Sequence, residues 1–190
     1  MTPERRFLPA EAPQATGRTV SGYAARFNSR SENLGIPDRP FHEIILPGAF
    51  DDVLGDDVIA CYNHREDLIL ARSKNGEGSL KLRADSVGLH YSFEAPNTTT
   101  GNDLLESIKR GDINASSFAF TVADDGDTIT QEAGGKLRTI RKVSRLYDVS
   151  AVSRPAYSAA TVSARALASN APQVATPRAN GWRLQIDFLK

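Results

Sequence analysis

The sequence is poor in cysteine, with Cys61 alone in 190 residues, so it cannot form an intrachain disulfide. Such a chain fits a reducing cytoplasm, because secreted domains of this size are often held by disulfides. It also has no apolar run long enough to span a membrane. Residues 1–19 contain Arg5 and Arg6 but no apolar signal core after them. We therefore expect neither export nor membrane insertion.

Net charge is absent as well. Lys and Arg together number 23, and so do Asp and Glu. A general nucleic-acid binder usually carries a basic excess, so nucleic acid is not an expected partner. Hydrophobic residues make up 40% of the chain, which is enough for one domain with a core.

Several motifs that would indicate particular chemistry are missing. No His/Cys cluster has zinc-ligand spacing, and the sequence has no P-loop and no Gly-x-Gly-x-x-Gly. The Gly-x-Ser-x-Gly elbow of α/β-hydrolases is also absent. We therefore expect no metal and no cofactor.

The patterns that are present predict a β-rich α+β fold in one domain. Apolar and alternating segments predict strands at 20–27, 42–46, 58–62, 113–122 and 137–152, and a hairpin from 79–84 and 87–93. A helix is predicted over 100–110, begun by Thr100 with Asp103 or by Asn102 and ended by Gly111. A shorter helix is predicted within 47–54, and 124–135 is predicted to be a polar loop.

Composition divides the chain into four parts. Residues 1–17 are predicted to be a flexible N-terminal arm or a short edge strand, and 18–157 the main domain. Residues 158–180 are rich in Ala, Ser, Thr and Pro, which is typical of a linker. In 181–190, apolar residues alternate with polar ones, which predicts a terminal strand or docking tail.

Three residues in separate elements could carry chemistry. His64 follows a buried strand in a polar loop, where scaffolds often present functional groups. Ser117 alternates with phenylalanines, so it is expected on the opposite face, toward a cleft or solvent. Asp148 lies in an apolar strand, where a carboxylate needs a partner. A surface histidine, an ordinary strand serine and a salt bridge to nearby arginines are the plainer interpretations.

Two neighbouring residues are alternatives. Ser116 adjoins Ser117, but strand alternation sends the two hydroxyls to opposite faces, so only one can meet His64. Cys61 lies inside an apolar strand and is predicted to be an inert core thiol.

Five segments, in this order, resemble motifs of the prohead protease family of HK97-type phages and gene-transfer agents, an assemblin-like group. They are GYAARFN at 22–28, FHEIILPGAF at 41–50, NH at 63–64, GDINASSFAF at 111–120 and LYDVSAVSRPAY at 146–157. Ala115 and Ala119 stand where the family usually has glycine, and Asp148 stands where glutamate is common.

The resemblance implies a single-domain assemblin-like β-barrel surrounded by a few helices. It implies a serine endopeptidase with Ser117 as nucleophile, His64 as base and Asp148 as orienting acid. Apart from the resemblance, one oxyanion donor is expected from Ser153 or Arg154, just past the strand that carries Asp148. The implied substrates are the major capsid protein, its scaffold segment and the protease itself.

By the same resemblance, the chain would act inside the assembling prohead, near the portal, in the host cytoplasm. The sequence does not decide whether the chain forms a homo-oligomer. A non-catalytic capsid-assembly or scaffold-binding module is the alternative from another class. An intact serine, histidine and aspartate set argues against that alternative, and serine-dependent self-cleavage would discriminate between the two.

Overall fold

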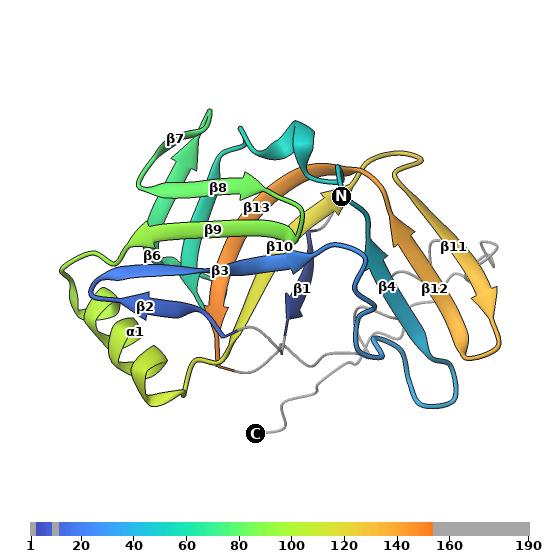
Figure 1. Ribbon diagram of the computed structural model, residues 1–190, viewed down its shortest axis with the longest axis horizontal. Helices are drawn as coiled ribbons and strands as arrows, with labels where there is room; N and C mark the ends of the chain where they lie inside the picture. Colours follow the sequence, from blue (N-terminus) through green and yellow to red (C-terminus); the bar gives the residue numbers. More distant parts are fainter. Residues whose placement is uncertain (1–2, 9–11, 154–190) are drawn as a thin grey trace, which may run out of the picture.

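A computed structural model of the protein describes residues 3–8 and 12–153 (Figure 1). Strands dominate this part of the chain, with a single α-helix and one short 3-10 turn among the described residues. The elements are β1 (Glu4–Leu8), β2 (Gln14–Thr16), β3 (Thr19–Arg26), β4 (Phe41–Ile45), η1 (Asp51–Val53), β5 (Val58–Tyr62), β6 (Arg65–Lys74), β7 (Glu77–Gly78), β8 (Leu80–Ala84), β9 (Gly88–Glu94), α1 (Thr99–Arg110), β10 (Ala115–Val122), β11 (Asp127–Glu132), β12 (Gly135–Ile140) and β13 (Val143–Val152).

The strands form three sheets. The largest has six strands in the order β1-β10-β13-β5-β6-β7. A four-stranded sheet, β2-β3-β9-β8, crosses in front of it in Figure 1, and β3 contacts both β1 and β10. A three-stranded sheet, β11-β12-β4, lies to one side. The arrangement corresponds to crossed packing of two sheets around one core.

The expected β-barrel surrounded by a few helices is not what the described residues form. Their three sheets are open, and one α-helix accompanies them. A barrel closes only when the two edge strands of a sheet pair with each other. The edges of the large sheet are β1 and β7, and no ladder joins them in the described part of the chain. The β-rich character of the prediction is correct, and the closed barrel is wrong.

The core lies where β10 faces the crossing sheet. Phe118 and Phe120 stack with ring centroids 4.8 Å apart, and Phe50 meets Phe118 edge-on at 5.7 Å. All three are essentially inaccessible to solvent. This packing fixes one face of β10 toward the core, so the residues between the phenylalanines face the other way.

Helix α1 follows the prediction apart from its first residue. Its N-cap is Thr98, whose hydroxyl accepts a hydrogen bond from the Gly101 amide, so neither Thr100 nor Asn102 caps the helix. The C-cap is Gly111, which adopts a left-handed φ of 79° as predicted. Three consecutive threonines offered equivalent caps, and the sequence could not distinguish them.

Other elements agree with the sequence, with two additions. The β8–β9 hairpin is confirmed, and the Asp85 carboxylate accepts hydrogen bonds from the Val87 and Gly88 amides in its turn. The segment expected to be a polar loop contains β11, paired with β12. Residues 4–8 and 14–16 form β1 and β2, which corresponds to the edge-strand alternative for 1–17. The predicted linker 158–180 and tail 181–190 lie outside the described residues.

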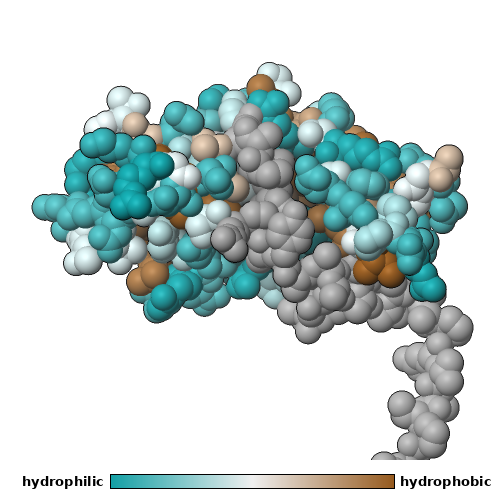
Figure 2. Space-filling view, turned by 90° about the horizontal axis from the view of Figure 1, so that it is seen from below, coloured by the Kyte–Doolittle hydropathy of each residue, from teal (hydrophilic) through white to brown (hydrophobic). Residues whose placement is uncertain are grey.

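The face shown in Figure 2 is mainly hydrophilic, with hydrophobic residues in separate small groups. Large hydrophobic side chains that are substantially exposed in the described part are Ile36, Ile69, Val87 and Ile129. None of the described helices is long and apolar enough to cross a membrane.

Candidate active site

His64 is held by a two-residue turn between β5 and β6. Tyr62 pairs with Arg65 across the hairpin, and the two residues between them, Asn63 and His64, have φ values of 53° and 57°. Positive φ at both central positions is the requirement of a type I′ turn, and asparagine and histidine tolerate it better than most residues. The turn is further held by the Asn63 amide, which donates to the Ala151 carbonyl at 3.1 Å. A rigid turn therefore positions the imidazole over the large sheet.

Ser117 and Asp148 come from two neighbouring central strands of that sheet. β10 and β13 are antiparallel, with Ser117 opposite Ser150 and Ala119 opposite Asp148. Alternation places Ser117, Asp148 and Ser150 on the face away from the core phenylalanines. β13 also runs parallel to β5, with Ala151 opposite Tyr62, which brings the His64 turn to the same place.

The three side chains form a continuous hydrogen-bond network. His64 Nε2 lies 2.5 Å from Ser117 Oγ, and His64 Nδ1 lies 2.7 Å from Asp148 Oδ1. With Asp148 ionised, Nδ1–H donates to the carboxylate and Nε2 is free to accept a proton from the serine. The network is buried, with Ser117 3% exposed and Asp148 5% exposed. The sequence predicted a cleft or solvent around Ser117, whereas the hydroxyl is covered here.

Two further residues extend the hydrogen-bond network beyond Asp148. The Ser150 hydroxyl donates to Asp148 Oδ1 at 2.9 Å, and Cys61 Sγ lies 3.2 Å from Ser150 Oγ. Burial, aided by the negative charge of Asp148, raises the pKa of the Cys61 thiol to about 12, so it stays protonated and can donate to Ser150. Ser150 was not predicted from the sequence, although its place two residues after Asp148 on one strand puts both on one face.

Ser116 has a different environment. Its hydroxyl lies 2.9 Å from the Tyr91 hydroxyl of β9, on the core side of β10, and it is fully buried. Burial raises the pKa of Tyr91 to about 12, so the phenol is neutral, and one of the two hydroxyls donates a hydrogen bond to the other. The two serines point to opposite faces, as alternation predicted, and only Ser117 meets His64.

The other histidines are engaged elsewhere. His42 Nδ1 lies 2.9 Å from the Ser31 carbonyl oxygen, and the His90 ring meets Tyr23 edge-on at 5.1 Å. Neither contacts the Ser117 network.

Of the expected oxyanion donors, Ser153 is described, and Arg154 lies outside the described residues. The Ser153 amide donates to Asn63 Oδ1 at 3.1 Å, next to the His64 turn. The Ser117 hydroxyl also contacts the backbone of β1, since Arg6 O lies 2.7 Å from Ser117 Oγ.

A buried group of charged side chains adjoins this backbone contact. Arg6 binds Glu43 of β4 through two nitrogens, and Arg138 of β12 donates to the same carboxylate at 3.0 Å. Burial by itself would raise the pKa of Glu43, but the two guanidinium groups outweigh it and hold that pKa below its usual range. Glu43 is therefore ionised at neutral pH and joins three sheet elements.

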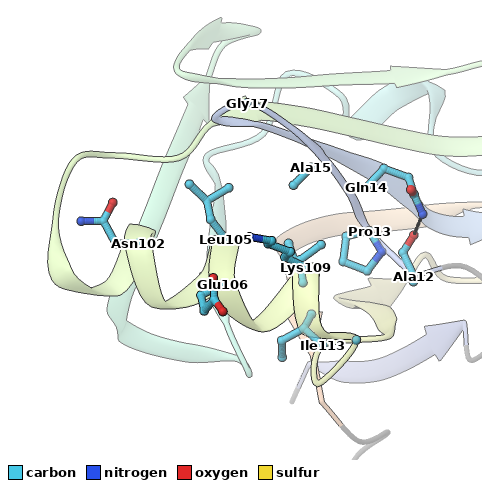
Figure 3. Close-up of a pocket in the computed structure, with 12 residues that line it drawn as sticks. Ala12, Pro13, Gln14, Ala15, Gly17, Asn102, Leu105, Glu106, Lys109 and Ile113 are labelled. Carbon is cyan, nitrogen blue, oxygen red and sulfur yellow. Dashed lines mark hydrogen bonds between the residues drawn. The ribbon is translucent and has the colours of Figure 1, made fainter.

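A hollow of about 650 Å³ lies between α1 and the β2 region (Figure 3). Leu105 and Lys109 of the helix line one side, and Pro13 and Ala15 line the other. It contains no residue of the Ser117 network, and within the described residues no group of three or more His, Cys, Asp or Glu could hold a metal.

Comparison with known families assigns the chain to one of them. Residues 8–173 match the family described as Caudovirus prohead serine protease, which covers most of the chain. The chain belongs to that prohead serine protease family. It is therefore a phage serine protease of capsid maturation, as its motifs suggested. No curated protein and no solved structure gives a significant match.

Proposed function

We propose that Ser117 is the nucleophile of this prohead protease, His64 its general base and Asp148 the acid that orients His64. The observation that carries this proposal is the unbroken network with distances of 2.5 and 2.7 Å between the three side chains. A serine hydroxyl attacks a peptide carbonyl only when a base takes its proton, and a histidine held by a carboxylate does so near neutral pH.

In the first step Ser117 Oγ bonds to the scissile carbonyl carbon while its proton moves to His64 Nε2. The imidazolium that forms is stabilised by Asp148, and it then gives the proton to the leaving amine as the C–N bond breaks. Water repeats the cycle on the acyl-enzyme and releases Ser117. The Ser153 amide, and that of Arg154, are proposed to bind the oxyanion, which for Ser153 requires release from Asn63.

The proposed substrates are the scaffold segment or arm of the major capsid protein and the protease chain itself. The reaction is proposed to occur within the assembling prohead in the host cytoplasm. Family membership supports an association with the prohead. The test is co-expression with a major capsid protein that carries its scaffold segment, followed by mass spectrometry of the shortened product. A capsid protein that keeps its full length beside an active protease would contradict the substrate assignment.

The nucleophile is tested with a fluorescent fluorophosphonate, which labels activated serines. Ser117→Ala should lose labelling and self-cleavage by about a thousandfold or more, because members of such a network act as a unit. Ser116→Ala is the matched control: it removes the hydroxyl bonded to Tyr91 and should lower stability by about 1–3 kcal/mol while labelling persists. Labelling that survives Ser117→Ala and disappears in Ser116→Ala would move the assignment by one residue. Absence of labelling and self-cleavage in the native chain would favour the non-catalytic module.

A further inference from the structure

Strand β1 lies along the nucleophile in the manner of a bound peptide. It pairs antiparallel with β10, with the backbone of Phe7 opposite Ser117. The carbonyl oxygen of the preceding residue, Arg6, is 2.7 Å from Ser117 Oγ. Addition of an extended peptide to a sheet edge is a common mode of peptide recognition, and it would place a substrate carbonyl at this serine. Without β1, β10 would be the edge strand of the large sheet.

The contact with β1 opposes catalysis. The Ser117 hydroxyl has one proton and two acceptors, Arg6 O at 2.7 Å and His64 Nε2 at 2.5 Å. A proton given to Arg6 O is unavailable to His64 Nε2, which has to accept it for Ser117 to attack. The hydroxyl also meets the carbonyl oxygen, whereas attack requires the carbonyl carbon. Strand β1 therefore occupies the place of a substrate strand beside Ser117 without being cleaved.

The side chain of Arg6 anchors the strand. Its Nη2 donates to Glu43 at 2.7 Å and to Glu4 at 2.6 Å, and its guanidinium lies over the Phe120 ring, 5.7 Å from the centroid. Arg6 and Glu43 are 6% and 3% exposed. Such paired, desolvated contacts are specific for a guanidinium.

The charges left behind favour another basic side chain. Glu4 and Arg6 both belong to β1 and would leave together when the strand is displaced. Glu43 would then lose both hydrogen bonds from Arg6 and keep only the one from Arg138, a guanidinium that also binds Asp127. A buried carboxylate without a full complement of donors is costly, so an incoming guanidinium would be bound strongly.

We propose that β1 is a built-in pseudosubstrate that closes the Ser117 site, and that substrates displace it by adding their own strand to β10 with an arginine on Glu43. This rests on the proposed role of Ser117. It predicts that weakening the Arg6 anchor opens the site, whereas a purely structural Arg6 predicts that the same change lowers activity.

The test compares fluorophosphonate labelling rates of the native chain, Arg6→Ala and Arg5→Ala. Arg5 is exposed on the same strand and is the matched control. We expect Arg6→Ala to label about tenfold faster or more, as the loss of charge-assisted hydrogen bonds implies, and Arg5→Ala to label at the native rate. Equal or slower labelling of folded Arg6→Ala, judged by circular dichroism, overturns the proposal. Absence of labelling in all three proteins refutes instead the role of Ser117.

A second measurement does not depend on the folding of Arg6→Ala. A synthetic peptide of residues 3–8, and the same peptide with leucine at the Arg6 position, are added to the native chain. We expect the arginine peptide to protect Ser117 from labelling at a concentration about tenfold lower than the leucine peptide. Equal protection by the two peptides, or protection by neither, excludes an arginine site on Glu43.

Discussion

Replacing Asp148 with asparagine preserves shape and removes the charge on which His64 depends. Asp148 Oδ1 now accepts hydrogen bonds from His64 Nδ1 at 2.7 Å and from the Ser150 hydroxyl at 2.9 Å. An asparagine has one acceptor oxygen and one NH2 donor. If the NH2 faces His64, the imidazole proton moves to Nε2, which then donates to Ser117 and cannot accept its proton. If the oxygen faces His64, the imidazolium formed during attack lacks its counter-charge.

The expected loss is therefore large. The corresponding asparagine substitution in a Ser-His-Asp protease lowers kcat by about ten-thousandfold, which is about 5.4 kcal/mol of transition-state stabilisation. Ser150→Ala is the matched comparison, because it removes one hydrogen bond and keeps the carboxylate, and it should cost about tenfold. Fluorophosphonate labelling and the rate of self-cleavage report the activity, and thermal unfolding checks the fold. Asp148→Asn activity within tenfold of native would refute the orienting role of the carboxylate.

Two further predictions concern buried groups near the site. Glu43→Gln leaves Arg6 and Arg138 without their shared carboxylate and should lower the free energy of unfolding by about 3 kcal/mol at neutral pH, measured with urea. Because the folded-state pKa of Glu43 lies below its unfolded value, its contribution is full above the unfolded pKa and is lost as pH falls through the folded one. Native stability should thus fall more steeply in acid than that of the variant, and equal slopes would contradict this. Cys61, with a pKa raised to about 12, should resist iodoacetamide at pH 8 until the protein unfolds, and rapid alkylation of the folded chain would disprove its burial.

Local patterns in the sequence were enough to predict much of the candidate site. The alternation of Ser116 and Ser117 with the phenylalanines of β10 separated a core hydroxyl from one on the site face, and Gly111 marked the end of α1. These features depend on residues a few positions apart, where period-two alternation and helix capping act.

Contacts between distant segments were beyond such patterns. Residues 4–8 show no clear alternation, yet they pair with a strand more than a hundred residues away and cover Ser117. β11 was hidden because its residues are mostly polar and exposed, as suits a sheet edge. The open sheets also could not be foreseen from local patterns, since closure of a barrel depends on whether two edge strands that are distant in the sequence pair with each other.

Asp148 faces Ser117 because of an irregularity in β13, and strand alternation alone would have predicted the wrong face for it. Leu146 and Asp148 are two residues apart, so a regular strand would put both on one face. Leu146 instead lies fully buried in the core opposite Phe120, while Asp148 lies opposite Ala119 on the face of Ser117. Consecutive residues of β10 thus pair with positions two apart in β13, and Tyr147 is the extra residue of a β-bulge. Bulges re-aim side chains in this way beside active sites. The bulge is what allows one short segment to supply both a core leucine and the carboxylate that holds His64.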